Sequence, residues 1–168
     1  GALELVPVRH SIPAGDFYAG RTVREWFSKR YNDAPGYKEA LNVSDSDRRK
    51  CNLIIVGSSR TLRPIALFDE THPELVFRLT EAGICAREPE TRNVRTLDDQ
   101  SGPEGIALSR VVVTNWVRST GNAYTIIGGN HSRAIAAVAA MLVSDSGLKD
   151  GTDRLIHDGQ IPDRYQMA

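Results

Sequence analysis

The stretch from Tyr124 to Ser144, YTIIGGNHSRAIAAVAAMLVS, constrains the fold more than any other part of the sequence. An apolar run of strand length, Tyr124 to Ile127, is followed by two glycines and then by apolar residues at helical spacing. These residues are Ile135, Val138, Ala139 and Leu142, at the i, i+3, i+4 and i+7 positions of one helix face. The stretch therefore predicts a buried strand, a tight turn and a helix over 131–143.

The same order of features occurs a second time, around residue 57. Asn52 to Val56 (NLIIV) is a continuous apolar run, which is typical of a central parallel strand covered on both faces. A small polar turn with glycine follows, and then a predicted helix over 62–69 with Pro64 in its first turn. Two strand–turn–helix units predict an α/β fold.

The remaining elements are predicted from local patterns. Asp16 is interpreted as the N-cap of a helix over 16–30. Residues 37–43 have the alternation of a strand, and 44–50 read as a capped helical turn. Two antiparallel hairpins are expected, 75–80 with 84–87 and 106–118 with the Tyr124 strand. The polar residues 88–105 are interpreted as a mobile loop, long enough to form a lid.

Together these elements predict a three-layer, Rossmann-like α/β sandwich with a mixed sheet and antiparallel hairpins. Residues 1–146 are expected to form a single α/β domain. Residues 147–168, polar and rich in Gly and Asp, are expected to form a C-terminal tail that is partly docked. The first residues, Gly1 and Ala2, indicate a piece of a longer multidomain chain, and a homodimer is also considered.

Charge and cysteine content limit the partners. Lys+Arg and Asp+Glu both number 21, so the formal net charge is zero, which argues against direct nucleic-acid binding and against a polybasic membrane surface. No apolar run approaches the roughly 18 residues that span a bilayer, and no signal peptide is visible. The two cysteines, Cys51 and Cys85, lack metal-site spacing and favour buried thiols in a reducing compartment. We therefore expect a cytoplasmic protein without cofactor or metal.

The first candidate site is GGNHSR, formed by Gly128, Gly129, Asn130, His131, Ser132 and Arg133. Two glycines let the backbone approach a ligand closely, and the N-terminal N–H groups of the following helix attract anions. The imidazole, hydroxyl and guanidinium groups suit a phosphate, a carboxylate or a nucleotide edge. The alternative is an ordinary helix cap made by Asn130 or Ser132.

The second candidate site is the turn after the NLIIV strand, with Gly57, Ser58, Ser59 and Arg60. Ligands of open α/β sheets bind beyond the carboxyl ends of parallel strands, so the two turns converge if their strands are parallel neighbours. The alternative is a tight turn with serine caps.

Three functions are compatible with these loops. The leading one is a sensory or regulatory domain that binds a small anionic, nucleotide-like molecule. The second is an enzyme that acts on a nucleotide or glycosidic bond in the same crevice, and the third is a protein-interaction module without a ligand. No catalytic residue is assigned. Ser58 or Ser59 with His131 as base is one conceivable set, for which Asp69, Glu70 or Asp99 is the acidic partner. Otherwise Asp98 and Asp99 are interpreted as solvated.

Taken in order, GDFYAGRTVREWF, NLIIVGSSRT, VVVTNWV and YTIIGGNHSRAIAAVAAML resemble a bacterial domain type of uncharacterised role. In that type, a Rossmann-like unit follows a DNA-binding or signalling module. The resemblance covers roughly residues 15 to 145. It implies a regulatory domain that binds a small ligand, and it implies no catalytic residue.

Overall fold

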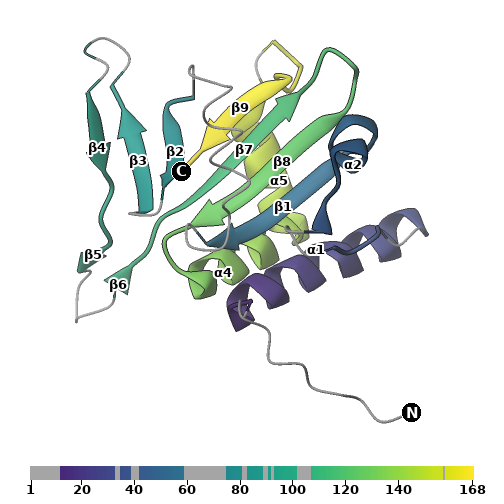
Figure 1. The fold of residues 1–168 in the computed structure, drawn as a ribbon, viewed down its shortest axis with the longest axis horizontal. Coiled ribbons are helices and arrows are strands. Elements are labelled where there is room, and N and C mark those ends of the chain that lie inside the picture. Colours follow the sequence, from purple (N-terminus) through teal and green to yellow (C-terminus); the bar gives the residue numbers. More distant parts are fainter. Residues whose placement is uncertain are drawn as a thin grey trace.

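The computed structural model describes residues 12–32, 35–38, 42–58, 75–80, 83–88, 91, 93–101, 107–156 and 158–168. Its helices there are α1 (Ala14–Tyr31), α2 (Asp45–Lys50), α4 (Ser132–Leu142) and α5 (Asp145–Leu155). Its strands are β1 (Leu53–Ser58), β2 (Phe77–Thr80), β3 (Gly83–Arg87), β4 (Val94–Thr96), β5 (Gln100–Ser101), β6 (Ala107–Leu108), β7 (Val111–Val117), β8 (Ala123–Gly129) and β9 (Arg164–Met167). This mixture of helices and strands confirms the α/β class (Figure 1).

The main sheet has the strand order β1-β8-β7-β9. Strands β1 and β8 are parallel, whereas β7 is antiparallel to both β8 and β9, so the sheet is mixed as predicted. The β7–β8 pair is the predicted hairpin. Strand β8 is internal, whereas β1, predicted as central, is the outermost of the four described strands of this sheet. Its apolar side chains are only partly covered: Ile54 is 40% exposed, and the other apolar side chains of the strand are half-buried.

Helices α1 and α4 cover one face of the main sheet (Figure 1). Small residues, Ala19 of α1 and Ala139 of α4, are fully buried and let the two helices approach closely. Ile135 of α4 is also fully buried, in a core with Val113 and Ile127 of the sheet. The apolar spacing predicted for α4 therefore corresponds to its buried face. The helix predicted over 62–69, which would form a second helical layer, lies outside the described residues.

A second, antiparallel sheet has the order β2-β3-β4 and contains the other predicted hairpin. Gln166 of β9 joins the two sheets through its side-chain amide. Its Oε1 accepts from the Phe77 N–H at 2.9 Å, and its Nε2 donates to the Phe77 carbonyl at 2.8 Å and to Thr114 Oγ1 at 2.9 Å. The side chain thus bonds to β2 as a neighbouring strand would.

Replacing Gln166 by Ala should lower the free energy of unfolding by about 2 kcal/mol, because the N–H and carbonyl of Phe77 lose their partners in a partly buried place. Urea unfolding measures this loss. Gln100→Ala, at an exposed position in β5, is the matched control and should change stability by less than about 0.5 kcal/mol. Equal losses in both variants would contradict the bridging role of Gln166.

Hydrogen bonds at the N-termini of α1 and α2 test two of the predictions. The helical turn over 44–50 is confirmed as α2, with a capping box between Ser44 and Asp47. The prediction of Asp16 as an N-cap is wrong: α1 begins at Ala14 after Pro13, and Asp16 lies in the first turn. Its side chain is turned inward, as described below, and so does not cap the helix.

Three polar segments differ from expectation. Residues 88–105, predicted as a loop, contain the short strands β4 and β5. In the segment 37–43, the described residues 37, 38, 42 and 43 belong to no strand. Residues 147–168, predicted as a partly docked tail, contain most of α5 and the strand β9, which pairs with β7 from Val113 to Trp116.

Candidate functional site

The carboxyl ends of β1 and β8 lie side by side. Gly57 is paired with Gly128, and Ser58 with Gly129. The convergence of the two predicted turns therefore holds for these residues. Ser59 and Arg60 lie outside the described residues.

The backbone N–H at the end of β1 already donates a hydrogen bond to a carboxylate. Asp16 Oδ2 accepts from the Ser58 N–H at 3.0 Å, and Asp16 is only 4% exposed. The first turn of α1 brings this side chain to the sheet edge from 42 positions away in the sequence. Asp16 thus holds the position beside Ser58 in which an external anion was expected, and sequence reasoning missed it.

The two glycines at the end of β8 approach other parts of the protein. A Cβ added at Gly128 would collide with the side chain of Leu79 from β2. A Cβ at Gly129 would lie 2.8 Å from the carbonyl oxygen of Arg110. Both contacts are closer than real Cβ atoms make, so packing alone accounts for these glycines.

The N-terminus of α4 is packed against the N-terminus of α1. His131 is the N-cap residue, and its side chain makes no capping hydrogen bond. A Cβ added at Gly15 would collide with the backbone of Ser132 and lie 2.9 Å from the Arg133 nitrogen. Helix α1 therefore covers part of the end of α4 that the sequence offers to an anion. The Arg133 side chain remains exposed.

Asn130 connects three parts of the chain. Its Oδ1 accepts from the Ile84 N–H at 2.9 Å. Its Nδ2 donates to the Leu97 carbonyl and to Asp99 Oδ1, both at 3.1 Å. The amide therefore fixes the end of β8 to β3 and to the segment between β4 and β5, which is a structural role.

His131 forms an ion pair with Asp99 at the surface of this edge. Nε2 of His131 lies 2.6 Å from Asp99 Oδ2, and the two side chains are 64% and 24% exposed. Asp99 is thus held by Asn130 on one oxygen and by His131 on the other. It is not a solvated loop carboxylate. When Nε2 carries a proton toward Asp99, a neutral imidazole keeps Nδ1 as its acceptor.

Arg110 is a further cation at this edge that sequence reasoning missed. Its carbonyl accepts from the Asn130 N–H at 3.3 Å, so Arg110 stands opposite Asn130 at the start of β7. Its Nε is buried and has no hydrogen-bond partner within the described part of the chain. The only signal in the sequence was an arginine directly before the apolar run VVVTNWV.

Among the described residues, no three His, Cys, Asp or Glu side chains form a group that suits a metal ion. No helix in the same part of the chain has the length and apolar character needed to cross a membrane.

No protein-family model, curated protein or solved structure matches this chain.

Proposed function

We propose that the chain is a ligand-binding domain that takes a small anionic molecule at the edge where β1 and β8 end. The observation that supports this proposal is the in-register parallel pairing of these strands, which places both glycine-containing turns at one edge. Such an edge is where open α/β sheets bind their ligands.

We propose that the anion binds at the rim of this edge, beside the described cations. Asp16 occupies the Ser58 N–H, so a second anion beside it would meet a carboxylate. Arg133 is exposed at the first turn of α4, and His131 becomes a second cation there when protonated. A phosphate group fits these donors because guanidinium binds it through paired hydrogen bonds. We therefore propose a nucleotide-like ligand, held by Arg133 and His131 outside the buried carboxylate.

The wider setting belongs to the same proposal. We propose a three-layer, Rossmann-like fold. The domain would act as the regulatory part of a longer bacterial chain in the cytoplasm, as a monomer or homodimer. It would contact neither membrane nor nucleic acid.

Ligand-induced stabilisation tests the binding proposal. Purified protein is screened by thermal unfolding against nucleotides, cyclic dinucleotides, NAD and simple anions. A ligand at 100 times its Kd should stabilise the wild type by about 2.7 kcal/mol. Arg133→Ala should lose most of this gain. Arg49→Ala removes another exposed arginine, in α2, and should keep it. If both variants respond like the wild type, the proposed edge does not bind that ligand.

The pairing of His131 with Asp99 favours a second candidate, an enzyme that transfers a proton at the same edge. A carboxylate that holds one imidazole nitrogen fixes the tautomer, so that the other nitrogen can act as general base. For a bound ligand that is turned over, His131→Ala and Asp99→Asn should each lower kcat by about 100-fold or more while Arg133→Ala mainly raises KM. A ligand that binds without being turned over would support the ligand-binding domain and argue against the enzyme.

A further inference from the structure

One edge of the Arg78 guanidinium, in β2, makes no hydrogen bond to the described residues. Its Nε and Nη2 atoms are buried, and neither has a hydrogen-bond partner among the residues that the structure describes. These two nitrogens lie along one edge of the planar guanidinium group, so their N–H groups point in the same direction. They form the fork that binds the two oxygens of a carboxylate or phosphate.

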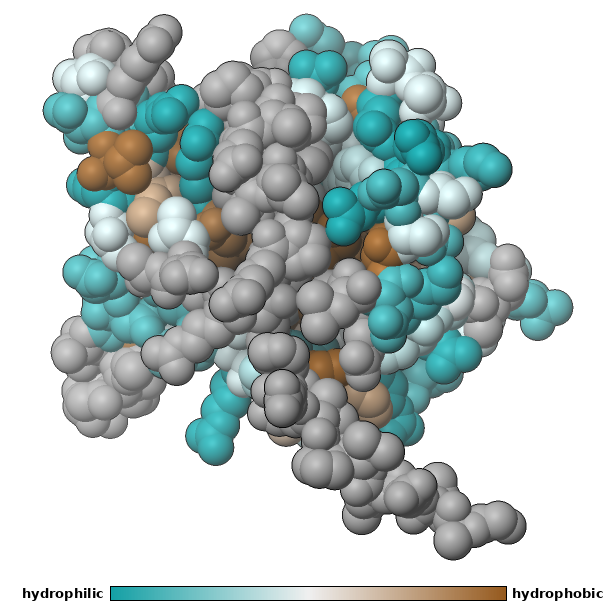
Figure 2. All heavy atoms as spheres, viewed as in Figure 1, coloured by the Kyte–Doolittle hydropathy of each residue, from teal (hydrophilic) through white to brown (hydrophobic). Residues whose placement is uncertain are grey.

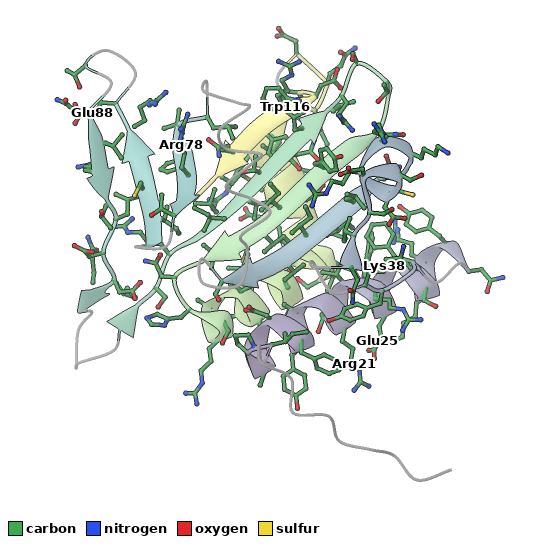
Figure 3. All side chains as sticks on the ribbon, viewed as in Figure 1. Arg21, Glu25, Lys38, Arg78, Glu88 and Trp116 are labelled. Atoms are coloured by element: carbon green, nitrogen blue, oxygen red, sulfur yellow. The ribbon has the colours of Figure 1, made fainter. Side chains whose placement is uncertain are left out.

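On the sheet face that carries Arg78, the cross-strand neighbours that the structure describes are polar and carry no negative charge. Cys85 of β3 lies directly opposite Arg78, and Thr96 of β4 lies opposite Cys85, so the three side chains share one face of the sheet. The Cys85 Sγ lies 3.5 Å from Thr80 Oγ1 and 3.9 Å from Thr96 Oγ1. Hydroxyl and thiol groups therefore share the sheet face that carries Arg78, which is labelled in Figure 3.

The whole β2-β3-β4 sheet is positively charged. Its strands have the sequences FRLT, GICAR and VRT, with three arginines and no acidic residue. The acidic residue that directly follows β3, Glu88, accepts from Thr91 Oγ1 at 2.8 Å. The three described strands therefore offer Arg78 no carboxylate of their own.

A buried guanidinium without a partner is unfavourable, because its N–H groups have lost water and gained nothing. An oxyanion that binds the fork would recover that loss. We propose that the β2-β3-β4 sheet contains a second anion site, in which Arg78 binds a phosphate or carboxylate group through Nε and Nη2, beside Cys85 and the two threonines. This site is separate from the edge of β1 and β8 and does not depend on the proposed function.

Thermal unfolding at constant ionic strength tests the site with inorganic phosphate, and with acetate as a separate carboxylate arm. At 100 times its Kd, the anion should raise the wild-type Tm by roughly 5–10 °C in a saturable way. Arg78→Met should melt above the wild type in oxyanion-free buffer, because it removes an unpaired buried charge, and it should show no saturable response. Arg95→Met, on the neighbouring strand β4 and exposed, is the matched control and should respond like the wild type.

Comparison of the variants separates this site from general salt effects and from the other edge. A saturable response that is equal in the wild type and Arg78→Met would overturn the proposal, as would a wild type without any saturable response to either anion. Arg133→Ala should keep the phosphate response if Arg78 binds the anion.

If Arg78→Met does not fold, the ¹⁵N resonance of Arg78 Nε in the wild type decides. It should move on addition of the stabilising anion, and a resonance that does not move contradicts the site. The anion that gives the response identifies the ligand group as phosphate or carboxylate.

Discussion

Gly15→Ala is expected to lower the free energy of unfolding by about 3 kcal/mol. The added Cβ would collide with the backbone of Ser132, and a backbone cannot rotate away as a side chain does. Helices α1 and α4 would have to separate where Ala19 and Ala139 now bring them close. Urea unfolding, with the m value as a check on two-state behaviour, measures the loss.

Gly20 provides a control of the same chemical type on the same helix. A Cβ added there meets only the ring edge of Tyr37, at 3.3 Å, and Tyr37 is an exposed side chain that can move. Gly20→Ala should therefore gain up to about 1 kcal/mol from helix propensity. Opposite signs in the two variants are the expected result. A Gly15→Ala protein as stable as Gly20→Ala would mean that α1 does not cross α4 at Ser132.

Asn130→Asp is expected to cost about 3 kcal/mol at pH 7. The new carboxylate cannot donate to the Leu97 carbonyl, and it stands where an amide nitrogen now lies 3.1 Å from Asp99 Oδ1. Two carboxylates in contact raise the pKa of one of them in the folded state above its unfolded value. The charge repulsion is therefore absent in acid and develops as the pH rises above about 4. The missing donor to Leu97 persists at every pH.

Urea unfolding at several pH values separates the loss caused by the charge repulsion, which depends on pH, from the loss caused by the missing donor to Leu97, which does not. Asp99→Asn in the same chain should restore the part of the stability that depends on pH, because an amide again faces a carboxylate. Asn122→Asp is the matched control, since Asn122 donates to the Arg49 carbonyl at an exposed place. It should cost less than about 1 kcal/mol. A pH-independent loss in Asn130→Asp would show that Asp99 is not its neighbour.

Strands β1 and β8 and helix α4 could be predicted from the sequence because their signals are local, whereas the parallel pairing of the two strands was only a condition of the predicted site. Both strands are apolar runs that end at glycine, and Ile135 and Ala139 repeat at helical spacing. The role of Asp16 could not be predicted in this way. An aspartate near the start of a helix is normally a cap, and only the packing of α1 on the sheet edge shows that its carboxylate reaches Ser58. The two glycines at 128 and 129 were likewise explained by a ligand, although Leu79 and Arg110 approach them.

Short strands with few apolar residues also escaped prediction. Strand β4 is exposed at all three positions, so no buried face marks it. Strand β9, RYQM, is held by backbone pairing with β7 and by the amide of Gln166, and neither bond depends on hydrophobic spacing. Hydrogen bonds between distant segments leave no periodic signal in the sequence.

On the face drawn in Figure 2, the hydrophobic side chains of the described residues form small separate areas among hydrophilic ones.

The parallel pairing of β1 with β8 has a kinetic consequence. Asn52 Oδ1 accepts from the Ala123 N–H, 71 positions along the chain, at the entrance to this pair. Closing so long a loop costs chain entropy before the contact gains anything in return. The β7–β8 hairpin and α4 are local and can form early, whereas β1 must dock onto them later. Until that step, β8 has an open, apolar flank, and at high concentration during refolding this flank is where two molecules would first associate.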